Sequence, residues 1–265
     1  MSGEVAAPPS PLAAIRAIAL NTFREAIRDR ILYLLLAFAL GVIAVSRLLS
    51  LLTVGSEEKI IKDVGLSAIS LFGVLTTVFV GTSLVFKEVE RRTIYTLLAN
   101  PVARWQFIGG KFAGLLAVLA LNLGLMSAVL GAVLLLRDES PWPLVPAIAL
   151  ILVELAVIAA FALLFSSLTN PILAALGTFA VYVAGHLSWS LRLLADKVGS
   201  GLGAVLCEGL YRVLPNFDYL DLKASAVHGL PRPPGLVPAA AAYGLAYAFV
   251  VLVVACFAFQ RRDFK

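Results

Sequence analysis

The sequence consists of long apolar runs separated by short polar segments. Six runs stand out, at residues 31–52, 64–86, 107–136, 144–168, 172–191 and 237–259. Each is close to the roughly 20 residues that a helix needs to cross the hydrocarbon core of a bilayer. We therefore expect an all-α membrane protein, with six transmembrane helices forming one domain over residues 31–265. An even number of spans places both termini on the same side of the membrane.

Residues 1–30 precede the first run and predict an amphipathic helix. Ser10 suits an N-cap and Pro11 the first helical position, and Asn170-Pro171 repeats this pair between the fourth and fifth runs. A helix with one apolar face can lie in the lipid interface or act as an ordinary basic helix beside the membrane. The two predicted faces carry Leu12, Ile15, Ala19, Phe23, Ala26 and Ile27 on the apolar side and Asn21, Arg24, Glu25 and Arg28 on the polar side.

Residues 87–111 form a long polar segment with a strongly helical pattern. Glu88, Arg91 and Arg92 recur at helical spacing, and Leu97 belongs to an adjoining apolar patch, which predicts an amphipathic helix over about residues 87–100. Pro101 suits the first turn of the helix that follows. On charge alone the segment can be a basic cytoplasmic loop or a helix that docks on a partner.

The order of residues in this segment favours docking. An acidic and basic helix, then Leu97-Leu98-Ala99, Pro101-Val102 and Gly110-Lys111, resembles the permease subunits of type-2 ATP-binding-cassette (ABC) exporters, in particular the multicopper-enzyme-maturation subfamily typified by the nitrous-oxide-reductase copper system. The resemblance covers nearly the whole chain. It assigns ATPase coupling to Glu88, Arg91, Arg92, Thr93, Leu97, Leu98, Pro101 and Arg104.

The resemblance also implies partners. In that family the polar helix is a coupling helix, which docks into a groove on a separate ATPase and passes its motion to the membrane helices. We would then expect a homodimer of this chain with two copies of the ATPase, and an elbow helix within residues 1–30. ATP and Mg²⁺ would bind to the ATPase, so no cofactor is expected in this chain.

Composition agrees with a membrane subunit. With 61% hydrophobic and 14% charged residues, and a mean hydropathy of +0.97, the chain is too apolar for a soluble domain. The net charge of +5 comes from basic residues at the ends of the runs, which indicates orientation in a membrane and not nucleic-acid binding. Their distribution predicts a multi-pass protein of the cell inner membrane with cytoplasmic termini.

Catalytic and metal-binding patterns are sparse. Gly109-Gly110-Lys111 lacks the spacing of a phosphate-binding loop, and the histidines and cysteines are scattered over different segments. His186 and Ser188 have no acidic partner or glycine-flanked serine that would indicate a hydrolase. We therefore expect a non-catalytic subunit, and a non-ABC scaffold or an intramembrane enzyme is the weaker alternative.

Two features lie inside the runs. Gly124, Ala128, Gly131 and Ala132 form a small-residue stripe that would let another helix approach closely. Glu154 is the acidic residue farthest from either end of a run. It can serve a hydrogen bond between helices, with Asn122 or a serine, or it can form an intramembrane polar site for substrate or a proton.

The long loop at residues 192–236 is predicted to lie outside the membrane. It contains an amphipathic pattern over residues 195–214, followed by a Leu-Pro-Asn-aromatic element that resembles an external segment of the copper-maturation subfamily. Two functions remain open: export of an amphiphilic substrate, or mechanotransmission to an extracytoplasmic accessory protein. The second would use the contacts predicted at Pro215, Asn216, Phe217 and Asp218, whereas a segment that only covers the bundle or the membrane surface would need no partner.

Overall fold

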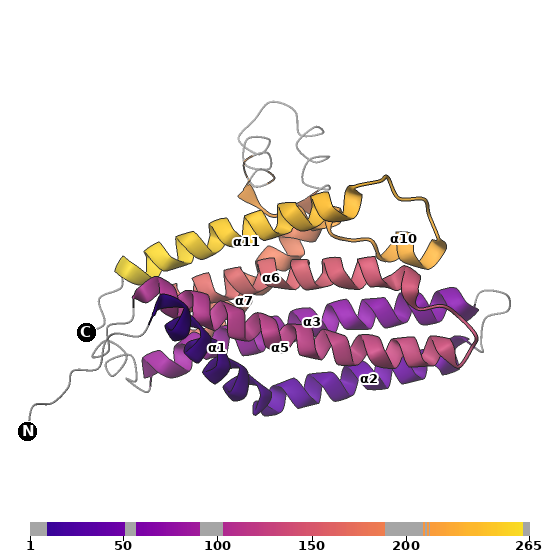
Figure 1. The fold of residues 1–265 in the computed structure, drawn as a ribbon, viewed down its shortest axis with the longest axis horizontal. Helices are drawn as coiled ribbons and strands as arrows, with labels where there is room; N and C mark the ends of the chain where they lie inside the picture. The colour runs from indigo at the N-terminus through magenta and orange to yellow at the C-terminus, as the bar shows by residue number, and fades with distance from the viewer. Residues whose placement is uncertain are drawn as a thin grey trace, which may run out of the picture.

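The computed structural model describes residues 10–50, 57–90, 103–188, 209, 211 and 213–261, and their regular structure is helical throughout. The long helices run side by side as a bundle (Figure 1). We call the end where α5 begins and α11 finishes the terminal end, and the opposite end the distal end. The elements are α1 (Pro11–Ile27), α2 (Arg30–Ser50), α3 (Glu57–Glu90), α5 (Arg104–Leu135), η1 (Trp142–Leu144), α6 (Val145–Leu168), α7 (Pro171–His186), η2 (Phe217–Tyr219), α10 (Lys223–His228) and α11 (Leu236–Arg261).

The predicted spans are confirmed in part. Among the described residues, four segments have the length and hydropathy of a membrane span: one lies in α3, one is α5, one joins η1 and α6, and one lies in α11. The first predicted span, α2, passes the same test only together with α1, as a pair bent by 63°. The fifth, α7, has 16 residues and is a shorter apolar helix. The chain is therefore a multi-pass membrane protein with four or five candidate spans in the described part.

Two predicted helix starts are confirmed. The Ser10 side chain accepts a hydrogen bond from the Ala13 amide at 3.4 Å, and Asn170 accepts one from the Leu173 amide at 2.9 Å. Each capping residue is followed by a proline in the first turn, where a missing N–H leaves no hydrogen bond unmade. The third predicted start was wrong: the helix expected to have Pro101 in its first turn, α5, begins at Arg104 with Ala103 as its N-cap, and Pro101 itself lies outside the described residues.

The packing of α1 agrees in part with the predicted faces. Its buried residues are Ala14, Thr22 and Ala26, while Leu12 is 78% exposed. The reason lies in α5, where Gly114 removes the side chain that would separate the two helices. A Cβ atom on Gly114 would lie 2.6 Å from the Ala19 carbonyl oxygen. Small residues of α1 therefore meet α5, and Phe23 and Ile27 of the predicted apolar face pack against the core, whereas Leu12 points outward.

α6 lies at the centre of the bundle. It contacts α3, α5, α7 and α11, and most of its residues are buried (Figure 1). This explains why its sequence is apolar around the whole helix instead of along one stripe. Any polar residue on α6 must therefore find its partners inside the protein.

The small-residue stripe of α5 is not covered by another described helix. Gly124, Ala128 and Ala132 are exposed, and a Cβ atom on Gly124 would meet no atom within 4 Å in the described part of the chain. The predicted close approach is thus not made within one chain at these residues. Gly131 has a neighbour, but it is Pro141 in the loop that follows α5, to which a Cβ would make an ordinary contact at 3.7 Å.

The two glycines of α5 provide a matched test of this packing. We expect Gly114→Ala to destabilise the bundle by about 1–3 kcal/mol, because the added methyl group overlaps with α1. Gly124→Ala adds the same methyl group to the same helix where there is open space, so it should leave stability unchanged or raise it slightly. Thermal unfolding of both variants in detergent measures the difference. Equal melting temperatures would contradict the close contact.

Candidate functional site

Arg104, one of the residues predicted to couple to an ATPase, joins two helices at the terminal end. Its guanidinium Nη1 donates to the Phe259 carbonyl at 2.9 Å and to the Gln260 carbonyl at 2.7 Å. These carbonyls belong to the last turn of α11, where backbone acceptors lack partners within the helix and the helix dipole favours a cation. The first residue of α5 is thus held on the last turn of α11.

A second charged residue connects α5 to α1. Lys111 is fully buried, and its Nζ lies 3.7 Å from a carboxylate oxygen of Glu25 and 5.8 Å from the centre of the Phe107 ring. Phe107 in turn stacks on Phe259 of α11 at 5.5 Å between ring centroids. Glu25, expected on the polar face of α1, therefore reaches into the bundle. Arg104 and Lys111 together tie α1, α5 and α11, and we call this group of contacts the terminal junction.

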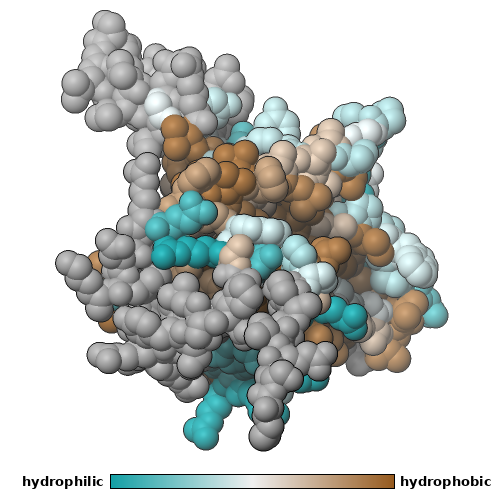
Figure 2. Space-filling model, turned by 60° about the vertical axis from the view of Figure 1, so that its left-hand side comes forward, coloured by the Kyte–Doolittle hydropathy of each residue, from teal (hydrophilic) through white to brown (hydrophobic). Residues whose placement is uncertain are grey.

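The remaining predicted coupling residues are less completely described. Helix α3 continues to Glu90, so the backbone of Glu88 belongs to the last turns of a helix that begins near the distal end. Figure 2 looks toward the terminal end, where hydrophilic residues gather and hydrophobic residues cover the adjoining side of the bundle. The other predicted residues, Arg91, Arg92, Thr93, Leu97, Leu98 and Pro101, lie outside the described residues.

Glu154 lies on α6 inside the bundle and is only 1% exposed. Its Oε1 atom lies 3.5 Å from Nε2 of His186 on α7, so the neighbour is a histidine and not the predicted asparagine. Asn122 instead donates to the Thr76 hydroxyl at 3.3 Å. That part of the prediction was wrong because helix order alone does not say which faces of α3, α5, α6 and α7 meet.

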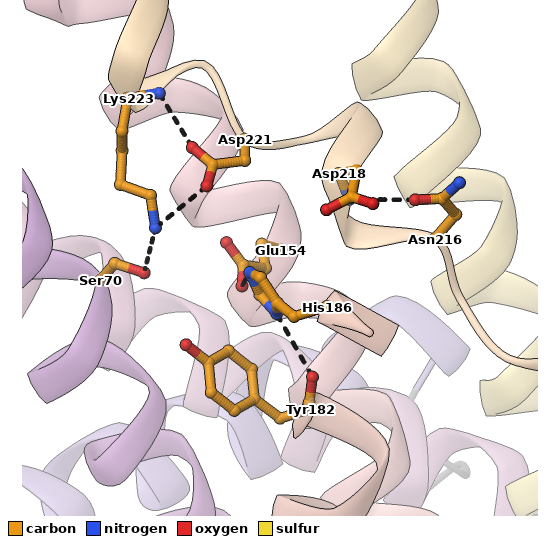
Figure 3. Close-up of polar contacts among 8 residues, drawn as sticks. All are labelled: Ser70, Glu154, Tyr182, His186, Asn216, Asp218, Asp221 and Lys223. Atoms are coloured by element: carbon orange, nitrogen blue, oxygen red, sulfur yellow. Dashed lines mark hydrogen bonds and ion pairs between the residues drawn. The ribbon is translucent and has the colours of Figure 1, made fainter. Parts of the chain in front are cut away.

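His186 has a defined orientation. Its Nδ1 atom lies 3.3 Å from the backbone carbonyl oxygen of Tyr182, one turn earlier on α7. The imidazole also packs edge-on against the Tyr182 ring, with 4.7 Å between centroids. Glu154, Tyr182 and His186 lie together in Figure 3, beneath the segment that carries Asp221 and Lys223.

That segment, residues 213–223, packs on the bundle instead of extending away from it. Phe217 is fully buried, with its ring centroid 5.4 Å from that of His186. Gly185 makes this possible, since a Cβ atom there would lie 2.5 Å from the Phe217 ring. Among the predicted partner contacts, Pro215 and Phe217 are therefore buried in the chain itself, whereas Asp218 is exposed.

Two other helices, α11 and α3, hold the same segment. Tyr243 and Tyr247 of α11, one turn apart, bind it: the Asn216 amide donates to the Tyr243 hydroxyl at 2.9 Å, and the Tyr247 hydroxyl donates to the Val213 carbonyl. The segment ends at Lys223, the first residue of α10, whose Nζ lies 3.4 Å from Asp221 and 3.4 Å from the Ser70 hydroxyl of α3 (Figure 3). The tyrosines, four residues apart in an otherwise apolar helix, are a sequence signal that the prediction did not use.

The described residues contain no group of three or more histidine, cysteine or acidic side chains that could hold a metal ion. A cavity of about 530 Å³ opens beside α10 and is lined by charged and polar side chains as well as apolar ones. Asp221 and Lys223 form part of its wall and also lie beside Glu154 in Figure 3. The charged and polar lining residues are Lys59, Asp63, Ser67, Asp221, Lys223 and His228.

The fold and these contacts define a multi-pass helical membrane protein with a charged junction at one end and a buried polar group in the distal half. Residues 16–264 match the model of the ABC-2 family transporter proteins, and the chain belongs to that family. No curated protein matches the sequence. The chain is therefore a membrane subunit of the permease type, which in this family is generally non-catalytic and works with an ABC ATPase.

Arg104→Gln tests the terminal junction. We expect it to lower stability by about 1–3 kcal/mol, because two charge-assisted bonds to the end of α11 are lost. Hydrogen exchange at the last turn of α11 should become faster, and thermal unfolding should occur earlier. Arg16→Gln, at an exposed position on α1, removes the same charge without such bonds and should have little effect on either measurement. Identical behaviour of the two variants would refute the junction.

Proposed function

We propose that this chain is the permease subunit of an ATP-driven transporter and that a separate ATPase docks on the segment between α3 and α5 at the terminal end. The terminal junction is the observation that carries this proposal. Arg104 follows the docking segment directly and is bonded to α11, and Lys111, two turns later, is paired with α1. Displacement of the segment would therefore move three helices and not one.

The burial of Lys111 makes this connection stiff. An ammonium group inside the protein is stabilised by the carboxylate beside it, so separating α1 from α5 would leave charge in an apolar environment. On the other side of the docking segment, α3 packs against α2 and α6. Both helices that flank the segment thus lead directly into the bundle, as a coupling element requires.

Charge at the terminal end supports a cytoplasmic location for the ATPase. The basic residues in or beside the helices that meet there include Arg24, Arg28, Arg30, Lys87, Arg104, Lys111 and Arg261, against the acidic Glu25, Asp29, Glu88 and Glu90. Basic residues beside membrane spans favour the cytoplasmic side, where ATP is available. ATP and Mg²⁺ would then bind to the ATPase.

We further propose that two copies of this chain assemble with two ATPase subunits. The exposed small-residue stripe of α5 supports contact with a second copy, since Gly124 and Ala128 would allow two helices to approach closely. Their exposure also fits contact with lipid. If the stripe contacts a second copy, the purified complex contains two permease chains. If it contacts lipid, the complex contains a single permease chain.

Two modes of action fit such a subunit: export of an amphiphilic substrate, and mechanotransmission to an extracytoplasmic protein as in the copper-maturation subfamily. The attachment of residues 213–223 favours the second. This segment is bonded to α11 and contacts α7, and Asp218 and Tyr219 are exposed on it. Movement of α11 at the terminal junction would therefore also move Asp218 and Tyr219, which are exposed away from the terminal end.

Changing Leu97 and Leu98 to Asp tests the docking proposal. We expect the double variant to insert and fold but to lose the ATPase on co-purification, with binding weakened at least about tenfold, because an apolar anchor has been charged. Leu135→Asp/Leu136→Asp, two exposed leucines at the distal end of α5, is the matched control and should retain the ATPase.

Normal ATPase binding by the Leu97 and Leu98 variant would rule out docking at this segment. Mass spectrometry of the wild-type complex also separates the two modes of action. An extracytoplasmic protein bound alongside the ATPase supports mechanotransmission, whereas a complex of permease and ATPase alone supports export.

A further inference from the structure

The contact between Glu154 and His186 requires a proton. A backbone carbonyl can only accept a hydrogen bond, so Nδ1 of His186, which faces the Tyr182 carbonyl, carries the imidazole hydrogen. In a neutral imidazole Nε2 is then an acceptor, and it faces the carboxyl oxygen of Glu154 at 3.5 Å. Two acceptors at this distance repel each other unless one hydrogen is shared between them.

No other described group fulfils this need. Oε1 of Glu154 and Nε2 of His186 are both buried, and neither makes a hydrogen bond to a further residue in the described part of the chain. The charged groups nearby are Asp221 and Lys223, which pair with each other at 3.4 Å and so contribute little net charge. Asp218 is exposed, and its amide is bonded to Asn216. The Ser70 hydroxyl accepts a hydrogen bond from Lys223, and neither it nor the Tyr182 hydroxyl is bonded to Oε1 of Glu154 or Nε2 of His186.

We propose that Glu154 and His186 form a buried binding site for a single exchangeable proton, and that occupancy of this site keeps residues 213–223 seated on the bundle. With one proton the pair is neutral overall, either as carboxylic acid and imidazole or as carboxylate and imidazolium. Without it, a bare carboxylate remains inside the protein, which is strongly unfavourable. The His186 ring packs directly on Phe217 of the seated segment, so the two events are linked.

The cavity beside α10 gives the proton a route. Asp221 and Lys223 line it and also lie next to Glu154, so a small displacement of the segment would admit water to the pair (Figure 3). Once hydrated, the carboxylate no longer needs the proton. Loss of the proton and release of Phe217 would therefore favour each other.

The direction of the pH dependence follows from counting protons. In water, carboxyl and imidazole side chains titrate near about 4.3 and about 6.5, so between these values an unseated, hydrated pair binds one proton, as the seated pair does. Above about pH 6.5 the unseated pair binds no proton, while the seated pair still binds one. Seating is then weakened as the pH rises. Below the lower value the unseated pair binds two protons, and seating is weakened again.

Hydrogen exchange of the full chain in lipid nanodiscs tests this proposal. Peptides that cover residues 213–228 should lose protection by at least about tenfold from neutral to alkaline pH, after correction for intrinsic exchange. Glu154→Gln supplies a side-chain N–H to Nε2 of His186 without a titratable group, so protection should persist at alkaline pH. Glu139→Gln, a partly exposed glutamate at the distal end, is the matched control and should retain the wild-type pH dependence.

Protection that does not change with pH in the wild-type chain would overturn the proposal, and this measurement does not depend on the folding of any variant. The proposal would also fail if folded Glu154→Gln lost protection at alkaline pH to the same extent as the wild type. A purely structural contact between α6 and α7 predicts that outcome.

Discussion

Lys111 and Glu154 are ionisable residues in an apolar bundle, and each needs a compensating group inside the protein. An ammonium or a carboxylate removed from water is tolerated only beside an opposite charge, a hydrogen-bond donor or a proton. Lys111 has Glu25 of α1 within 3.7 Å, and Glu154 has His186 of α7 within 3.5 Å. The first pair keeps α5 and α1 together near the terminal end, and the second keeps α6 and α7 together farther along the bundle.

The long helices link the terminal junction to the Glu154–His186 pair. α11 is held at its last turn by Arg104 and, farther along, binds residues 213–223 through Tyr243 and Tyr247. It also packs along the central helix α6, which carries Glu154. A displacement that enters at the terminal end can thus reach the buried Glu154–His186 pair through rigid elements, without a flexible connection in the described part of α11. This continuity is what a subunit driven from one side of a membrane needs.

The sequence was sufficient for elements that depend on local chemistry. Four spans, the cap at Ser10 and the cap at Asn170 follow from hydrophobic run length and from side chains that bond to their own backbone. These signals involve residues close together in the chain. The burial of Thr22 on α1 did not follow, because it depends on Gly114 of another helix.

Contacts between distant segments could not be predicted from the sequence, because they too depend on which helices pack together. Glu154 was recognised as unusual, but its partner His186 lies 32 residues later and meets it only through the pairing of α6 with α7. Phe217 was expected to face outward, yet the absence of a side chain at Gly185 creates the space that buries it. In a chain where most residues are apolar, hydrophobicity alone does not distinguish a lipid-facing position from a buried one.

The central claim is that the terminal junction faces the cytoplasm, where an ATPase can reach it, while the distal end faces the opposite side. Topology reporters inserted at Gly229 and fused after Lys265 measure this directly in the intact membrane. The account predicts a cytoplasmic signal after Lys265 and an extracytoplasmic signal at Gly229. Signals from the same side, or the reverse arrangement, would contradict it.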